Sequence, residues 1–287
     1  MSPFRLPSSP PRRNADRRCT PMLPVARENH ADAARLRERL DAFYQATDDY
    51  LAFEARSDQS PCWHPVLARI RERTAAAGGP PLRVLEFGCG WSGFPAALGD
   101  LRGKVHLTLQ DVTDRHRGKL APEIDAFHAG DLATLAGPFD VIFSTYAWEH
   151  VSNPAATFRT LCGLLAPGGS LFLFGPRYDF PGYLPPSVRR SSLATRLAAH
   201  AWLPFARLRT RLSGVPGWWI HYEPAVFLAK DWYPDADAIH WVSRADLAAS
   251  LPAGWTIADA EMPPTRSAKR RFYEMVMLLR VEIRRPG

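Results

Sequence analysis

The feature that most constrains this chain is a glycine-rich turn that follows a short run of β-forming residues. Residues 82–87 read Leu-Arg-Val-Leu-Glu-Phe, and glycines follow at Gly88, Gly90 and Gly93. A strand that ends in G-x-G-x-x-G and leads into a helix is typical of a nucleotide-binding turn on an α/β sheet. The turn therefore predicts a Rossmann-like architecture with a ligand at the carboxyl end of the first strand.

Glu86, at the end of this expected strand, narrows the type of ligand. A carboxylate two residues before the first glycine would repel the pyrophosphate of a dinucleotide such as NAD. It suits a cofactor that brings a positive charge to this place. S-adenosylmethionine (SAM) carries an ammonium and a sulfonium group and has no phosphate, so Glu86 favours SAM over NAD.

Strands and helices alternate after the turn, which predicts an α/β fold with a doubly wound, largely parallel sheet and helices on both faces. The expected strands span residues 82–87, 105–110, 126–128, 139–144, 170–174, 255–260 and 273–283. The expected helices span residues 64–77, 93–101, 155–165 and 243–251. The rhythm is broken only by residues 176–230, which are rich in Pro, Arg and Trp and read as an insertion after the fifth strand.

Composition divides the chain into three regions. Residues 1–27 are rich in Pro, Arg and Ser and are expected to be a disordered basic tail. Residues 28–80 have helical periodicity and are interpreted as an N-terminal cap, either a lid over the cofactor or a helix packed on the sheet edge. Residues 81–287 form the predicted SAM-binding domain, in which the insertion 176–230 is expected to shape the acceptor site.

The net charge of +7 is concentrated in two segments. Residues 1–24 carry +4 and residues 177–213 carry +6, so the remainder is acidic, which argues against a nucleic-acid face over the whole domain. Within residues 188–212, arginines alternate with Leu, Trp and Phe. This pattern fits a membrane surface, an anionic acceptor, or a surface helix whose arginine stems cover apolar groups. Pro204 is expected to break or kink the segment.

The cysteines and the N-terminus indicate a cytoplasmic protein. Four cysteines form no C-x-x-C pair and no Cys/His cluster with zinc spacing, so no metal site is expected. Residues 1–24 lack the apolar stretch of a signal peptide, and no apolar run is as long as a membrane span. Cys89, inside the glycine turn, is interpreted as a small packing residue of the cofactor loop.

Further motifs follow the glycine turn. They are Asp111, 21 residues after Gly90, Asp131, residues 138–144 (PFDVIFS), residues 148–154 (WEHVSNP), residues 165–169 (LAPGG) and residues 240–247 (HWVSRADL). This series resembles the class I SAM-dependent methyltransferases, especially the broad "type 11"-like small-molecule group with an E-H-V-x-x-P segment after the fourth strand. The resemblance runs from about residue 82 to residue 174 and is weaker over residues 239–283. It implies about seven strands, the last one antiparallel.

The resemblance also implies a role for each matching position. The methionine part of SAM would be held by Glu86, Gly88, Cys89 and Gly90, the ribose by Asp111 and Val112, and the adenine by Asp131 and Leu132, while Ser144 and Tyr146 would line the pocket after the fourth strand. An acid such as Asp111 can bind both ribose hydroxyls. The three carboxylates of Glu86, Asp111 and Asp131 then match the amino acid, ribose and adenine of SAM.

Three histidines are candidates for a general base. Methyl transfer to oxygen or nitrogen can require a base with a pKa near neutrality, whereas a carbon acceptor can react without one. His150 follows the fourth strand, His240 precedes the last helix, and His221 lies in the aromatic Trp-Trp-Ile-His-Tyr-Glu segment of the insertion. The alternatives are that His150 shapes its loop, His240 caps a helix and His221 belongs to a small core.

The sequence therefore predicts a SAM-dependent methyltransferase for a small-molecule, glycan or lipid-linked acceptor, with a peripheral membrane contact through residues 188–212 as one option. An NAD-dependent oxidoreductase, a nucleic-acid methyltransferase and a non-catalytic SAM-binding protein are the alternatives. Residues 144–147 read Ser-Thr-Tyr-Ala, where amino-methylating DNA enzymes carry N/D-P-P-Y/F, so nucleic acid is the weaker choice.

Overall fold

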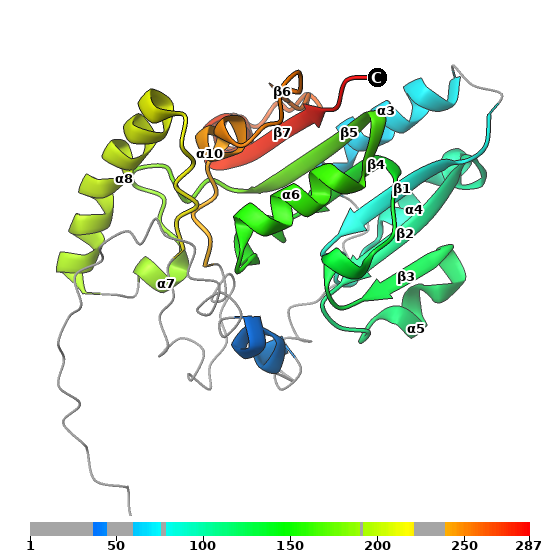
Figure 1. The fold of residues 1–287 in the computed structure, drawn as a ribbon, viewed down its shortest axis with the longest axis horizontal. Coiled ribbons are helices and arrows are strands. Elements are labelled where there is room, and N and C mark those ends of the chain that lie inside the picture. The colour runs from blue at the N-terminus through cyan, green and yellow to red at the C-terminus, as the bar shows by residue number, and fades with distance from the viewer. Residues whose placement is uncertain (1–36, 45–59, 76–78, 190–191, 221–238) are drawn as a thin grey trace, which may run out of the picture.

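The computed structural model describes residues 37–44, 60–75, 79–189, 192–220 and 239–287. At its centre is a seven-stranded sheet with the order β3-β2-β1-β4-β5-β7-β6 (Figure 1). The strands are β1 (Leu82–Phe87), β2 (Val105–Asp111), β3 (Ala126–Ala129), β4 (Phe139–Thr145), β5 (Leu165–Pro176), β6 (Thr256–Asp259) and β7 (Leu278–Arg284). Neighbours from β3 to β5 are parallel, and β7 is antiparallel to β5 and β6. The predicted mostly parallel sheet with an antiparallel last strand is confirmed.

Helices cover both faces of the sheet (Figure 1). The helices are an unlabelled one over residues 37–44, α3 (Trp63–Ala75), α4 (Phe94–Ala97), α5 (Arg117–Leu120), α6 (Pro154–Leu164), α7 (Pro186–Arg189), α8 (Leu193–Ser213), α10 (Arg244–Ala249) and α11 (Ala268–Phe272). The expected helix 93–101 is shorter than predicted, because α4 gives way to a 3₁₀ segment over Gly99–Lys104. Gly99 has φ of +50°, which a continuous α-helix does not accommodate.

Alternation along the buried strands divides the core into two layers. Val84 and Phe143 face α3 and α4, and the rings of Phe143 and Phe94 lie 4.4 Å apart between centroids. Leu85 and Phe87 face the opposite side and pack in the layer that contains α6 and α10. Both faces are covered, as a doubly wound sheet requires, so every central strand ends at the same polar edge.

The last strand begins later than the sequence indicates. The run of apolar residues from Tyr273 predicts a strand over 273–283, but Tyr273–Met277 continues α11 as a π-helical turn and β7 starts at Leu278. The side chain of Ser267 accepts a hydrogen bond from the N–H of Arg270 and begins this helix. A short apolar run fits either periodicity, and the cap determines which one forms.

The insertion contains a 21-residue helix, α8, that runs through Pro204. Ser192 caps its start, and Gly214, with φ of +66°, ends it. The predicted break at Pro204 is wrong. The proline removes one backbone donor from the helix, and packing of the neighbouring Leu203 in a small core with Ala199 and Trp241 compensates for this loss.

Glu282 of β7 joins three elements through a largely buried carboxylate. It accepts hydrogen bonds from Ser170 of β5 at 2.9 Å and from Arg284 at 2.7 Å, and it pairs with Arg69 of α3 at 2.8 Å. Burial alone would raise its pKa, but the hydrogen bonds from Arg284 and Ser170 and the charge of Arg69 outweigh burial and lower it.

We expect Glu282→Gln to destabilise the protein by about 1–3 kcal/mol at neutral pH, because two arginines lose their ionic partner. The native pKa of Glu282 lies below the ordinary 4.5, so its contribution is present above pH 4.5 and is lost as the pH falls through the native pKa. Urea unfolding at neutral and acidic pH measures this. The control, Glu72→Gln, removes only an exposed partner of Arg69 and should cost much less. Equal losses from the two variants would contradict the expectation.

Candidate active site

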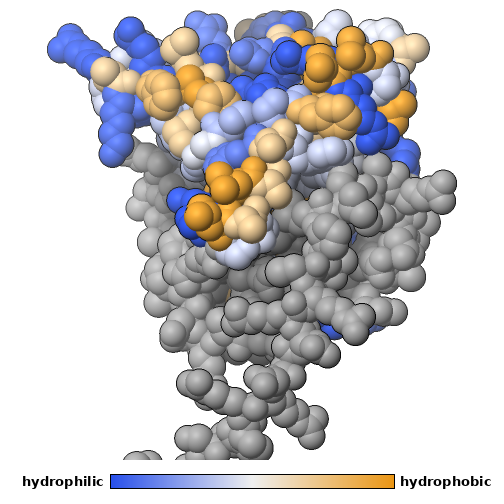
Figure 2. All heavy atoms as spheres, turned by 90° about the vertical axis from the view of Figure 1, so that its left-hand side faces the viewer, coloured by the Kyte–Doolittle hydropathy of each residue, from blue (hydrophilic) through white to orange (hydrophobic). Residues whose placement is uncertain are grey.

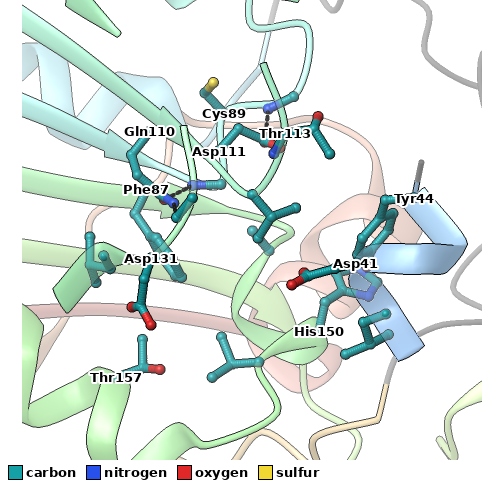
Figure 3. Close-up of a pocket in the computed structure, with 18 of the residues that line it drawn as sticks. Asp41, Tyr44, Phe87, Cys89, Gln110, Asp111, Thr113, Asp131, His150 and Thr157 are labelled. Carbon is teal, nitrogen blue, oxygen red and sulfur yellow. Dashed lines mark hydrogen bonds between the residues drawn. The ribbon is translucent and has the colours of Figure 1, made fainter. Parts of the chain in front are cut away.

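A cavity of about 300 Å³ lies at the carboxyl edge of the sheet (Figure 3). Its walls come from the ends of β1, β2 and β4, from the segment after β3, and from the helix over residues 37–44. Ligands of open α/β sheets bind in this position, next to the strand where the order reverses. In this sheet that strand is β1, between β2 and β4.

The glycine turn forms one wall through its backbone. Gly88 and Gly90 have φ of +67° and +49°, a region that disfavours other residues. A Cβ on Gly88 would lie 2.3 Å from the Cβ of Ala147, whereas a Cβ on Gly90 would meet nothing within 4 Å. Gly88 therefore allows the loop after β1 to touch the loop after β4.

Asp111 and Gln110, at the end of β2, hold this turn in place. The Asp111 carboxylate accepts hydrogen bonds from the N–H of Gly90 at 2.8 Å and of Thr113 at 3.2 Å. The Gln110 side chain accepts one from the N–H of Gly88 at 3.3 Å and donates one to the carbonyl of Gly130 at 2.8 Å. Sequence reasoning missed Gln110, although a polar residue in a buried strand is a usable signal.

Glu86 lies beneath the turn and is almost fully buried rather than part of the cavity lining. Burial raises the pKa of its carboxyl to about 8; a hydrogen bond with Ser92 opposes this rise, and the charge of Asp111 adds to it. Its Oε2 atom has no hydrogen-bond partner among the described residues. Such an orphaned acceptor beside a ligand loop fits a cationic group on the ligand.

Asp131 is engaged from two sides. Its Oδ1 accepts a hydrogen bond from the N–H of Ala133 at 2.8 Å, and its Oδ2 lies 2.5 Å from Nη1 of Arg37. Arg37 belongs to the helix over residues 37–44, which also brings Asp41 and Tyr44 into the cavity wall (Figure 3). The sequence predicts a cap over residues 28–80 but does not single out Arg37 and Asp41, which look like ordinary surface charges of a helix.

Tyr146 and His150 belong to the cavity wall formed by the segment after β4. Tyr146 has φ of +56°, an uncommon backbone conformation for a side chain of this size, and its hydroxyl lies 3.5 Å from that of Tyr273. His150 lines the cavity with its Nε2 4.0 Å from Oε1 of the buried Glu149. Ser144, expected to line the pocket, is fully buried and outside the lining.

The other two candidate bases, His240 and His221, are not among the described residues that line the cavity. His240 is fully buried, its Nδ1 lies 3.3 Å from the carbonyl oxygen of Trp148, and burial lowers its pKa to about 4. His221 lies outside the described residues. Among the residues that the structure describes, no group of His, Cys, Asp and Glu is arranged to hold a metal ion.

Comparison with known proteins gives the family. A family model described as "Methyltransferase domain" matches residues 63–248, more than half of the chain. The chain belongs to this family of methyltransferase domains. As the sequence predicts, the domain is SAM-dependent, and the comparisons give no support to the oxidoreductase and nucleic-acid alternatives.

The curated relatives of this methyltransferase domain include ubiquinone biosynthesis O-methyltransferases. A ubiquinone biosynthesis O-methyltransferase of Aromatoleum aromaticum is 31% identical over 126 residues, which cover 39% of this chain and 51% of the relative. A counterpart from Caulobacter vibrioides is 32% identical over 124 residues, 37% of this chain and 46% of the relative. The chain thus spans about half the length of these relatives.

Two solved structures share the fold of this methyltransferase domain. A Burkholderia thailandensis 1,6-didemethyltoxoflavin-N1-methyltransferase has a TM-score of 0.50 at 16% identity and covers 92% of this chain and 93% of its own. The plantazolicin methyltransferase BpumL has a TM-score of 0.51 at 10% identity and covers 90% and 99%. At these identities the likeness concerns the fold alone.

We expect Gly88→Ala to disrupt the site and Gly90→Ala to leave it largely intact. Both substitutions place a Cβ at positive φ, which costs about 1–2 kcal/mol. Only the Gly88 variant also forces a clash, with Ala147, which adds about 1–3 kcal/mol. Thermal unfolding and SAM calorimetry of the two variants compare these effects. Equal losses of stability and of SAM affinity would show that the close approach at Gly88 is unimportant.

Proposed function

We propose that the protein transfers a methyl group from SAM to the oxygen of a small-molecule acceptor. The observation that carries this proposal is one cavity that runs from the glycine turn to Tyr146 and His150. Donor and acceptor can meet in a single cavity, and methyl transfer requires that the two be held in contact. The names of the O-methyltransferase relatives support an oxygen acceptor. A glycan or a lipid-linked molecule remains within this acceptor class.

We propose that the residues around the turn hold SAM along its length. The backbone of Gly88, Cys89 and Gly90 would hold the methionine part, with the orphaned carboxyl of Glu86 behind it as the partner of the ammonium. Asp111 and Val112 would contact the ribose. Asp131 and Leu132 would contact the adenine. The Asp131 carboxylate would then bind the adenine together with Arg37 or in place of it. Bound SAM supplies a methyl carbon activated by the sulfonium.

The chain's own contribution to the reaction is to place the acceptor and exclude water. His150 is proposed to accept the proton of the acceptor hydroxyl, because it is the one candidate histidine among the described residues that lines the cavity. Tyr146, held in a strained conformation, would present its ring and hydroxyl to the acceptor. Tyr273 links Tyr146 to Tyr183 of the insertion through side-chain hydrogen bonds.

We propose that residues 28–80 cap the site. In support, the helix over residues 37–44 lines the cavity and is tied to Asp131 by Arg37. A closed cap would keep water from the reacting centre. The acceptor role proposed for the insertion 176–230 rests on Tyr183, whose side chain hydrogen-bonds Tyr273 of the tyrosine pair Tyr146 and Tyr273.

We further propose that the protein is cytoplasmic and associates peripherally with a membrane. Three cysteines, Cys62, Cys89 and Cys162, are free thiols, as is typical of reducing compartments. None of the described helices is both long and apolar enough to cross a bilayer.

We expect Glu86→Gln to raise the thermal stability of the cofactor-free protein and to lower its affinity for SAM. The native pKa of Glu86 is raised from 4.5 to about 8, so the wild type loses stability as the pH rises through this window. The variant should therefore unfold at a higher temperature than the wild type above pH 8, and the difference should vanish below pH 4.5. Its affinity for SAM should fall by about 10–100-fold, as for the loss of a charge-assisted hydrogen bond. Thermal unfolding and calorimetry measure both effects. Unchanged SAM affinity would exclude Glu86 as the ammonium partner.

His150→Gln should lower kcat/KM by about 10²–10⁴-fold and leave the affinity for SAM unchanged, because it removes only the proton acceptor. The assay is a panel of small phenols, alcohols and glycans with isotope-labelled SAM, and amines are run separately as nitrogen acceptors for comparison. His64→Gln, an exposed histidine on α3, is the matched control. If the His150 variant kept wild-type kcat/KM and pH profile, the histidine would not be the base. If the wild type bound SAM but methylated no member of the panel, the proposed acceptor class would be wrong.

A further inference from the structure

The long helix α8 is apolar on its outward side as well as on its inward side. On its inward side, Ala199 and Leu203 are buried in a small core with Leu184 and Trp241, and Ala206 is buried as well. Five large apolar side chains point the other way and are between 53% and 79% exposed: Leu193, Leu197, Phe205, Leu208 and Leu212. We call these five residues the outer α8 face.

The outer α8 face is a continuous stripe rather than scattered exposure. At 100° per residue its five members fall within an arc of about 120°, opposite the buried side of the helix. The helix has 21 residues, so the stripe extends over about 30 Å. Figure 2 shows orange and blue side chains side by side on this side of the molecule. A contiguous exposed patch of this kind marks an interaction surface.

Arginines border the outer α8 face, and acids are absent from the helix. Arg209 and Arg211 are exposed at the two edges of the stripe, and neither forms an ion pair with a described residue. The α8 sequence contains four arginines and no Asp or Glu. Arg207 is already paired with the buried Asp179 at 3.3 Å, so it serves the fold rather than the surface. The stripe is therefore apolar in its centre and cationic at its edges.

The helix is fixed to the methyltransferase domain by a buried acid. Asp246 of α10 accepts hydrogen bonds from the hydroxyl of Thr210 at 3.0 Å and from the N–H groups of Gly217 at 2.8 Å and Trp218 at 3.3 Å. Both ends of the connection between α8 and α10 are thus held in place. The outer α8 face is consequently presented in a set orientation and does not need to fold on binding.

We propose that the outer α8 face docks on the surface of an anionic lipid bilayer. The helix lies parallel to the bilayer, with its leucines and Phe205 at the acyl boundary and Arg209 and Arg211 against lipid phosphates. A second copy of this face would bring arginines against arginines, and the like charges oppose such pairing. A lipid surface provides apolar and anionic groups together along the whole stripe. This inference rests on the peripheral membrane association proposed above. It specifies the outer α8 face as the membrane-binding surface and anionic lipid as its partner.

The test is co-sedimentation of the full chain with vesicles of phosphatidylcholine alone or mixed with phosphatidylglycerol. The wild type should sediment with the vesicles that contain phosphatidylglycerol and should stay in the supernatant with vesicles of phosphatidylcholine alone. Leu197→Glu with Leu208→Glu should lower this binding by at least about tenfold, because both apolar anchors are lost. Arg209→Glu with Arg211→Glu should abolish the preference for anionic lipid. Arg71→Glu, an exposed arginine on α3, should bind as the wild type does. Since the substituted side chains are exposed, thermal unfolding and SAM affinity should stay unchanged.

Three results would overturn the proposal. The first is that the wild type binds neutral and anionic vesicles equally, and the second is that the Leu197/Leu208 variant binds vesicles as the wild type does. The third is that the wild type binds no vesicles but forms a dimer or a complex with another protein in sedimentation velocity, and that this assembly dissociates in the Leu197/Leu208 variant. Vesicle binding without methyl transfer to any acceptor would refute the proposed reaction and leave the lipid surface standing. Methyl transfer without vesicle binding would refute the lipid surface and leave the proposed reaction standing.

Discussion

The site depends on one carboxylate that joins the ends of two neighbouring strands. Asp111 of β2 accepts hydrogen bonds from Gly90 and Thr113, and so it ties the turn after β1 to the loop after β2. Without this acceptor the N–H groups of Gly90 and Thr113 would lose their partner at the edge of a buried sheet, which is costly. The same residue type suits the ribose hydroxyls of the cofactor. With the ribose contact proposed above, one side chain would combine a structural and a ligand-binding role.

Two of the buried glutamates, Glu282 and Glu86, differ in how the surrounding residues compensate their charge. Glu282 is surrounded by Arg69, Arg284 and Ser170, which lower its pKa and make it a structural link. Glu86 has one hydrogen-bonding neighbour, Ser92, and an acid nearby, and its pKa is raised. A buried carboxyl that the protein leaves poorly compensated is typical of a place where a ligand completes the site.

Much of the fold could be predicted from the sequence, because its main elements are specified locally. The apolar residues that form β1 and β4 alternate between two buried layers, Gly88 follows β1, and β2 ends at Asp111. Prediction was poorer where a short run fits two periods. The apolar residues from Tyr273 read as strand, but a cap at Ser267 makes them helical. Pro204 reads as a helix break, but tertiary packing of Leu203 keeps α8 whole.

By itself the sequence determined the α/β class, the cofactor and the acids at three strand ends, since each follows from residues adjacent in the chain. Only the tertiary structure could decide the rest of the wall. Arg37 reaches Asp131 across 94 positions of sequence, and Gln110 spans from Gly88 to Gly130. It also decided that His150 lines the cavity while His240 is buried. Pairings between distant residues arise from how the elements pack, and no local pattern specifies them.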